Sequence, residues 1–120
     1  MKPYQDARVE GEKLAKQYAE LEQADQVDFY NGLEGYYSVL GHNKKQEAIA
    51  VLIEKNDHKI YVYQLDKGIS QDKAATISRE KGASDIDKIT FGRYQDKPIW
   101  EVKSGNHYYL VDFETGAVIQ

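Results

Sequence analysis

Apolar and polar residues alternate most clearly near the C-terminus, in two runs separated by a short polar connection. Residues 98–102 and 107–113 each show the period-two pattern of a β-strand, and Ser-Gly-Asn at 104–106 is typical of a tight turn. A two-residue turn sets the register and places Trp100 opposite Val111. We therefore expect Trp100 to lie in the core rather than on an exposed interaction surface. The apolar face of this predicted hairpin consists of Pro98, Trp100, Val102, Tyr109, Val111 and Phe113.

The same stretch is similar to an earlier part of the chain at an offset of 48 residues. Trp100 then falls on Leu52 and Tyr109 on Tyr61, without a gap, and each copy follows a helix-like segment. Two repeats, each a helix followed by antiparallel strands, are therefore predicted.

The N-terminal segment is predicted as one helix over residues 4–24. Its apolar and small residues recur at steps of three and four and form a continuous stripe. The remaining positions are mostly charged, which indicates a solvated face; a coiled-coil partner is the alternative reading of the same charges. The predicted stripe consists of Ala7, Gly11, Leu14, Tyr18 and Leu21.

The chain between this helix and residue 46 has the pattern of extended segments and turns. Residues 27–30 are predicted to be extended, and Asn-Gly at 31–32 predicts a turn or bulge. A further strand is predicted over 36–40 and is ended by Gly41. A polar loop over 42–46 follows and leads into the first of the two hairpins.

The first hairpin is predicted from residues 47–54 and 59–65, and both of its faces are apolar. A single helix can cover only one of them. We therefore expect the N-terminal helix to cover one face and part of the second repeat to cover the other, so that Ile53 and Val62 are shielded. One face carries Ala50, Leu52, Tyr61, Tyr63 and Leu65, and the other Ile49, Val51, Ile53, Ile60 and Val62.

The second repeat begins with a short helix that the sequence delimits at both ends. Ser70 is a good N-cap, and Gly82 is a suitable C-terminal stop. A strand over 88–91 follows, and Gly92 together with Gln-Asp at 95–96 is predicted to turn the chain into the second hairpin. The inner stripe of the helix is predicted to be Ala74, Ile77, Ser78 and Lys81.

Composition limits the classes of partner. The 120 residues (13.8 kDa) carry a formal net charge of −4 and no lysine–arginine cluster typical of a phosphate-binding surface, so we expect no nucleic-acid partner. The absence of cysteine excludes disulfides, thiol catalysis and cysteine metal sites. No stretch has the roughly 20 apolar residues of a membrane span, and the N-terminus lacks the apolar core of a signal peptide.

The sequence predicts no catalytic, cofactor-binding or metal-ligating site. His42, His58 and His107 fall at predicted turns or strand ends, and no two have the spacing of a metal-ligand pair. Ser38 and Ser104 have no histidine and acidic residue at a recognisable triad spacing. We therefore expect a protein that is not an enzyme and needs no cofactor; the alternative is an enzyme with an unrecognised site.

Four short motifs, taken in order, resemble a PepSY-type repeat: Gly-Ile-Ser at 68–70, Ile-Thr-Phe-Gly at 89–92, Trp-Glu-Val at 100–102 and Tyr-Leu-Val-Asp-Phe-Glu-Thr-Gly at 109–116. Two earlier motifs, Phe-Tyr-Asn-Gly at 29–32 and Tyr-Tyr-Ser-Val-Leu-Gly at 36–41, extend the similarity over nearly the whole chain. With them, the chain resembles the YpmB (TseB)-like proteins of Gram-positive bacteria.

The resemblance implies an α+β fold of two cystatin-like, PepSY-type repeats, each a helix followed by a three- to four-stranded antiparallel sheet. The repeats are expected to span 1–67 and 68–120. The family also implies an extracytoplasmic domain anchored to the cell membrane by an N-terminal transmembrane helix that is missing from this chain. Its expected role is to regulate cell-wall elongation by binding a penicillin-binding transpeptidase.

The wider PepSY group implies an alternative role, in which the chain inhibits or regulates a secreted peptidase. An inhibitor of this kind needs a loop that enters a protease cleft, and residues 42–46 are the best candidate. This segment is polar and lysine-rich, without a strong anchor residue. Neither role carries a defined catalytic motif to transfer to this sequence.

Overall fold

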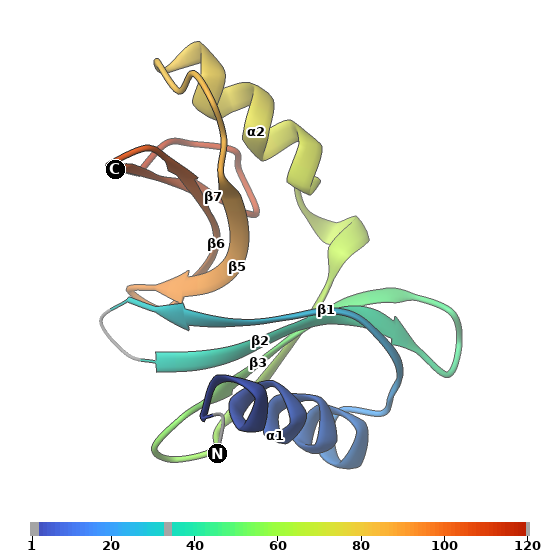
Figure 1. Ribbon diagram of the computed structural model, residues 1–120. Coiled ribbons are helices and arrows are strands. Elements are labelled where there is room, and N and C mark those ends of the chain that lie inside the picture. The colour runs from blue at the N-terminus through green and yellow to red at the C-terminus, as the bar shows by residue number, and fades with distance from the viewer. Residues whose placement is uncertain (1–2, 33–34, 120) are drawn as a thin grey trace. The chain divides into compact units, whose positions relative to one another are not determined.

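The computed structural model describes residues 3–32 and 35–119, and the side chains of those ranges from residue 9 onward. The chain forms two compact units, Met1–Gln64 and Leu65–Gln120, and the described residues give each unit one α-helix and one antiparallel sheet (Figure 1). The fold is therefore of the α+β class. The N-terminal unit contains α1 (Pro3–Tyr18), β1 (Leu21–Asn31), β2 (Gly35–Asn43), β3 (Ala48–Glu54) and β4 (Ile60–Gln64). The C-terminal unit contains a short 3-10 helix (Leu65–Lys67), α2 (Gln71–Glu80), β5 (Lys88–Tyr94), β6 (Lys97–Ser104) and β7 (His107–Asp112).

Helix α1 is shorter than the sequence pattern predicts. It ends at Tyr18, Glu20 has a left-handed backbone (φ 57°), and Leu21 begins β1. The prediction of a single helix over 4–24 was therefore wrong in its last part. Leu21 is nevertheless buried, because it reaches the same core from the start of the strand. A residue that meets the core in this way continues a helical stripe in the sequence without being helical.

The inner face of α1 also differs from the predicted stripe. Tyr18 is 60% exposed, since it lies in the last turn, and the side chain of Ala7 is outside the described part of the chain. Gly11 lies against the sheet, where an added Cβ would be 3.1 Å from the Cβ of Tyr37. This small residue therefore allows the helix to approach β2 closely. Among the α1 residues whose side chains are described, 9–18, those that are buried are Gly11, Leu14 and Ala15.

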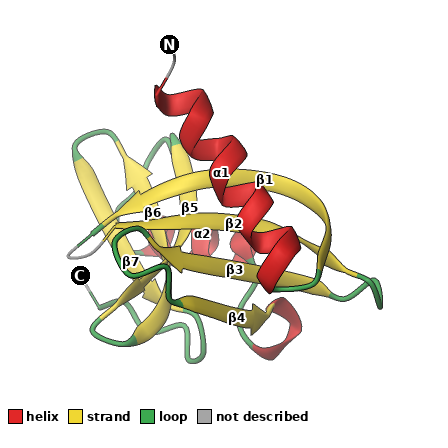
Figure 2. Ribbon diagram, turned by 90° about the horizontal axis from the view of Figure 1, so that it is seen from below, coloured by secondary structure: helices red, strands yellow, loops and turns green. Residues whose placement is uncertain are grey.

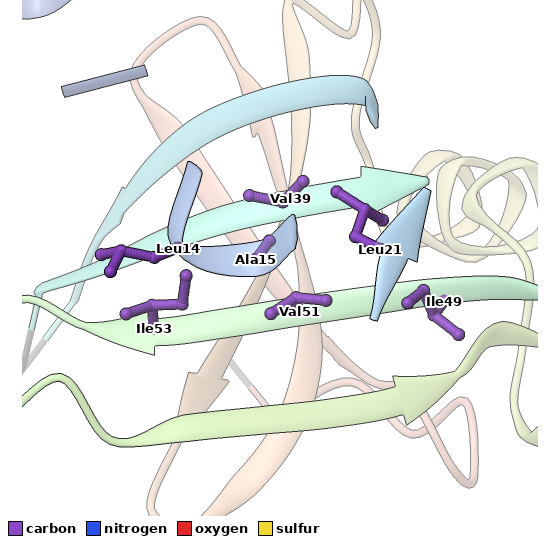
Figure 3. Packing of buried hydrophobic residues seen from close by; sticks show 7 residues of the cluster. All are labelled: Leu14, Ala15, Leu21, Val39, Ile49, Val51 and Ile53. Carbon is purple, nitrogen blue, oxygen red and sulfur yellow. The ribbon is translucent and has the colours of Figure 1, made fainter. Parts of the chain in front are cut away.

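The core of the N-terminal unit lies between α1 and its four-stranded sheet (Figure 3). The strands follow the order β1-β2-β3-β4, and each neighbouring pair is antiparallel. Alternate residues of β3 point towards the helix, so Val51 and Ile53 are fully buried. Burying each such side chain contributes about 1.5–3 kcal/mol. The cluster consists of Leu14, Ala15, Leu21, Val39, Ile49, Val51 and Ile53.

The pairing of β3 with β4 confirms the predicted sorting of the first hairpin into two faces, except at Leu65, which begins the 3-10 helix instead of continuing β4. Leu52 lies opposite Tyr61, and Val51 lies opposite Val62. Helix α1 crosses β1, β2 and β3 and leaves β4 beyond its edge (Figure 2). Ile53 is buried as expected, but Val62 is 48% exposed, so the expectation that Val62 is shielded was wrong. Coverage of the opposite face by the second repeat stays a prediction.

Gly41 continues β2 rather than ending it, and the predicted strand boundary at this residue was wrong. It lies opposite Ala24 of β1 and Ile49 of β3, and the strand extends to Asn43. A Cβ at this position would collide with the backbone carbonyl of Gln23. Glycine is therefore needed here for the close approach of β1, and it acts inside the sheet instead of in a turn.

The second hairpin has the predicted register. Trp100 lies opposite Val111 and Val102 opposite Tyr109, and Gly105 has the left-handed backbone of a turn residue (φ 62°). The order of strands in this sheet is β5-β6-β7. The alternation of apolar residues in the sequence was therefore sufficient to fix both the pairing and the faces of this hairpin.

Gly92 lies inside β5, opposite Ile99 of β6, so its prediction as a turn residue was wrong. The turn between these strands is formed by Gln95 and Asp96 alone, at the position that was predicted for them. Both residues have positive φ angles (50° and 65°), which are typical of a type I′ hairpin turn.

Helix α2 begins and ends as predicted. The side chain of Ser70 accepts a hydrogen bond from the backbone N–H of Lys73 (3.0 Å), and Gly82 follows the helix with φ 117°. The predicted inner stripe is correct only in part, because Ile77 is half-buried and Lys81 is exposed. The residues of α2 that are buried are Ala74, Ala75 and Ser78.

The 48-residue offset between the predicted repeats joins positions that are not equivalent. Leu52 lies on the face of its sheet that points away from the α1 core. Trp100 lies on the α2 side of its sheet, where its Nε1–H donates to the carbonyl of Ile69 just before that helix (3.0 Å). Because successive strand residues alternate between faces, the ungapped alignment equates opposite faces and was wrong. What the two units share is a helix followed by antiparallel strands.

Replacing Ser78 with alanine is expected to stabilise the protein by about 1 kcal/mol. Its hydroxyl is fully buried and has no hydrogen-bond partner among the described residues. Removing a buried unsatisfied polar atom recovers its desolvation cost, and alanine also has the higher helix propensity. Thermal unfolding followed by circular dichroism measures the effect, with an expected rise of about 4–8 °C in Tm for a domain of this size.

Ser70→Ala is the matched control, because it makes the same substitution at the N-cap of α2, where the serine hydroxyl does have a hydrogen-bond partner. It removes the N-cap hydrogen bond to Lys73 and is expected to destabilise by about 1 kcal/mol. If Ser78→Ala lowers Tm as Ser70→Ala does, the Ser78 hydroxyl has a partner in solution and the explanation is wrong.

Candidate functional site

The histidines lie at separate strand ends and turns. His42 lies near the end of β2, and its Nδ1 is 2.9 Å from Oδ2 of Asp25, with both side chains well exposed. His58 lies in the turn between β3 and β4, and His107 begins β7. Within the described part of the chain, no group of three or more His, Cys, Asp or Glu side chains is placed to hold a metal ion. The site at His42 is a single surface ion pair, which is worth at most about 1 kcal/mol when the imidazole is protonated.

The two serines that were considered as nucleophiles are enclosed strand residues. Ser38 of β2 lies between Asp28 and Leu52 in the sheet register and is 1% exposed. Ser104 ends β6 opposite His107 and is 7% exposed. A nucleophile must be reached by its substrate, so their burial favours a structural role for both hydroxyls.

Trp100 is a core residue, as the sequence predicts. It is 2% exposed and forms edge-to-face contacts with Phe91 (ring centroids 4.9 Å apart) and with Phe113 (6.4 Å). Phe91 and Phe113 also contact each other (5.2 Å), so the three rings form one cluster. The Trp-Glu-Val motif therefore supplies the centre of the C-terminal unit and not an exposed anchor.

The Asp-Phe-Glu-Thr-Gly motif at 112–116 builds a turn. The buried carboxylate of Asp112 accepts hydrogen bonds from the backbone N–H groups of Glu114 (2.8 Å) and Thr115 (3.0 Å). Gly116 follows with φ 82°, a conformation that favours glycine. The residue types of this motif are thus explained by the backbone geometry of the turn.

Residues 42–46, the candidate inhibitory loop, form a tight turn instead of an extended loop. His42 and Asn43 belong to β2, and the side-chain Oδ1 of Asn43 accepts from the backbone N–H groups of Lys45 and Glu47 (both 2.9 Å). Gln46 completes the turn with φ 65°. Only two lysines and one glutamine project from it, so the turn offers no apolar side chain to fill a protease pocket.

The exposed apolar side chains are spread over several elements. They were not predicted from the sequence, because an exposed valine or tyrosine in an amphipathic element has the same local pattern as a buried one. Val9 also lines a shallow, open hollow on the outer face of α1 together with charged neighbours, including the Glu12–Lys16 ion pair (3.0 Å). Among the described residues, the large apolar side chains with the highest exposure are Val9, Tyr18, Val62, Tyr108 and Ile119.

Replacing Glu101 with glutamine is expected to stabilise the protein at neutral pH. Burial raises the pKa of the Glu101 carboxyl above its ordinary value of 4.5, and the nearby Lys88 ammonium opposes that rise only in part. The folded state therefore disfavours the ionised form, and stability falls as pH rises from the unfolded-state pKa towards the raised folded-state pKa. Above that window the cost is constant, and the neutral amide avoids it.

Urea unfolding at pH 7 and pH 4 tests this expectation for Glu101. The stability gain of Glu101→Gln over the wild type is expected to be present at pH 7 and to shrink at pH 4, where the wild-type carboxyl is increasingly protonated. Glu80→Gln removes an equal charge from an exposed position on α2 and is expected to stay within about 0.5 kcal/mol of the wild type. A larger gain for Glu101→Gln at pH 4 than at pH 7 would contradict the assigned direction.

These features define a class of protein: a two-unit α+β chain whose distinctive motifs build cores and turns, and whose described residues include no group of side chains placed to hold a metal ion. A family model described as the cell wall elongation regulator TseB-like domain matches residues 10–54, from α1 to the end of β3. The chain is also 34% identical over 113 residues to the protein named "Probable cell wall elongation regulator TseB" of Bacillus subtilis (strain 168), a match that covers 88% of this chain and 70% of that protein.

A solved structure agrees with this relationship. The YpmB protein from Bacillus subtilis matches with a TM-score of 0.79 and 31% sequence identity, and the match covers 93% of each chain. The chain belongs to the TseB-like family. No helix in the part of the chain that the structure describes is both long and apolar enough to cross a membrane.

Proposed function

We propose that this chain regulates cell-wall elongation as a non-enzymatic, extracytoplasmic module that binds a penicillin-binding transpeptidase. The observation that supports the regulatory role is the 34% identity to a protein named as a cell wall elongation regulator, over most of both chains. A regulator of an enzyme of cell-wall synthesis can act by binding that enzyme, so we propose a penicillin-binding transpeptidase as the partner.

The proposed architecture is a tandem of cystatin-like, PepSY-type repeats over 1–67 and 68–120. Its support is that each unit contains a helix followed by an antiparallel sheet, with four strands in the first and three in the second. We further propose that a transmembrane segment preceding this part of the protein anchors it to the cell membrane. Such an anchor would hold the module close to membrane-bound enzymes of cell-wall synthesis.

The non-enzymatic part of the proposal is supported by what the motif residues do. Trp100 and Asp112, from the two most specific motifs, are buried and serve the core and a turn. The enclosed serines and separated histidines offer no arrangement of nucleophile and base within the described residues. A peptidase inhibitor is the weaker candidate, because the turn at 42–46 lacks an apolar anchor.

Crosslinking in cells tests the proposed partner. The chain is fused to the N-terminal membrane segment of Bacillus subtilis TseB and expressed in cells that lack TseB, and crosslinked proteins are quantified by mass spectrometry. Penicillin-binding transpeptidases are expected to be enriched over a control in which the same membrane segment carries an unrelated folded domain. Equal recovery of these enzymes with both fusions, at equal membrane abundance, would refute the proposed partner.

A further inference from the structure

The outer strand β4 presents an unprotected edge. It is the last strand of the sheet order β1-β2-β3-β4, and its five residues include no charge and no proline. The backbone N–H of Glu54 donates to the carbonyl of Lys59 (2.8 Å), which marks this pair as hydrogen-bonded. In an antiparallel ladder bonded and non-bonded pairs alternate, so Tyr61 and Tyr63 bond to β3. The N–H and C=O groups of the intervening residues, Ile60, Val62 and Gln64, point outward.

The remaining edges of the described sheets carry features that discourage strand pairing. β1 has two register shifts and carries acidic residues such as Asp25 and Asp28. β5 carries Lys88 and Arg93. β7 is covered in part by the chain's own C-terminal segment, through the bridge of Val111 with Val118 and the hydrogen bond from Ile119 N–H to the Leu110 carbonyl (2.7 Å). Bulges, charges and covering segments are the usual protections of an edge, and none of them is found at β4 among the residues that the structure describes.

On the α1 side of β4, the central residue Val62 is apolar and open to solvent. Helix α1 stops short of this strand (Figure 2), so Val62 is 48% exposed although its cross-strand neighbour Val51 is fully buried. A strand added to the outer edge of β4 places its own side chains beside Val62 on this face. Backbone pairing and burial of Val62 therefore favour the same position for a partner strand.

We propose that β4 pairs antiparallel with β4 of a second copy of this chain, with Val62 opposite Val62. In this register the outward-pointing residues face each other, because Ile60 meets Gln64 on both sides of the central valine pair. Tyr61 meets Tyr63, and no like charges are opposed within the strand. The segment Ile-Tyr-Val-Tyr-Gln is thus nearly self-complementary about its centre, which selects a second copy over a strand of unrelated sequence.

The two-fold axis of such a dimer is perpendicular to the sheet at Val62. It joins the two four-stranded sheets into one continuous sheet, and both copies of α1 lie on the same face, on either side of the paired valines. A five-residue edge is short, so the interface is small and the association is weak. The dimer is therefore to be sought at protein concentrations approaching about 1 mM.

Sedimentation equilibrium of the wild type over this concentration range is expected to show a reversible monomer–dimer equilibrium. Val62→Lys places a charge on the edge, and Val62→Pro removes an outward N–H that β3 does not use. Each is expected to weaken dimerisation at least tenfold. Val9→Lys is the matched control, because it replaces another valine, 65% exposed and located on α1, with the same charged residue. The dimerisation constant of this variant is expected to equal that of the wild type.

Hydrogen exchange of the wild type provides a readout that does not depend on variants. The amides of Ile60, Val62 and Gln64 are expected to become protected as concentration rises, whereas those of Tyr61 and Tyr63 are expected to be protected at every concentration. A wild type that stays monomeric to about 1 mM, or dimers that Val62→Pro leaves intact, would overturn the proposal. Protection that rises at other amides and not at these three would also overturn it.

Discussion

Replacing Ile53 with aspartate is expected to unfold the N-terminal unit. Ile53 is fully buried in the cluster between β3 and α1, beside Leu14 and Val51 (Figure 3). The substitution removes an aliphatic side chain worth about 1.5–3 kcal/mol of burial and places a carboxyl in a site without a partner for its charge. We expect a loss of at least about 4 kcal/mol, which is a large share of the stability of a domain of this size.

Urea unfolding measured by circular dichroism tests the effect at Ile53, and two variants control for its cause. Ile53→Val keeps the site apolar and is expected to cost about 0.5–1.5 kcal/mol. Val62→Asp introduces the same charge on the same face of the sheet, at a half-exposed position, and is expected to cost about 1 kcal/mol or less. If Ile53→Asp stays folded and only loses a binding partner, Ile53 belongs to a contact surface and the described core is wrong.

Replacing Trp100 with alanine is expected to destabilise the C-terminal unit by about 3–5 kcal/mol. The indole fills the centre of the cluster with Phe91 and Phe113, and its N–H donates to the Ile69 carbonyl that leads into α2. Truncation to alanine therefore leaves a large cavity and also an unsatisfied carbonyl. Because Trp100 is the single tryptophan of the chain, the variants are followed by far-UV circular dichroism rather than by tryptophan fluorescence.

Two variants separate the contributions at Trp100. Trp100→Phe keeps an aromatic ring but removes the hydrogen bond to Ile69, and is expected to cost about 1–3 kcal/mol. Tyr108→Ala truncates a 52% exposed aromatic residue on the adjacent strand β7 and is expected to cost less than about 1 kcal/mol. Equal losses for Trp100→Ala and Tyr108→Ala would show that the indole is not a core residue in solution.

The motifs that could be recognised in the sequence are made of residues that the fold itself requires. Of the residues in the motifs that carry the family resemblance, Trp100 packs in the core, and Asp112 and Gly116 build a turn. Residues that meet a partner need only be exposed and complementary to it, so they leave no local pattern. For this reason the sequence supported the family and gave no interface residue.

The sequence by itself determined the features that depend on neighbouring residues. The register of the Trp100 hairpin, the cap at Ser70 and the stop at Gly82 follow from alternation, a side-chain oxygen and a missing Cβ, each acting within a few positions. These signals are local, so no knowledge of the rest of the chain was needed.

Only the tertiary structure decided where α1 ends, why Gly41 is a glycine and why Val62 remains exposed. Leu21 fits a helical stripe as well as it fits a strand that begins in the same core, and the choice depends on its pairing with β2. The need for glycine at position 41 is set by the Gln23 carbonyl of the neighbouring strand. The exposure of Val62 is set by how far α1 extends across the sheet. These outcomes depend on contacts between segments far apart in the chain, which a pattern along the sequence does not contain.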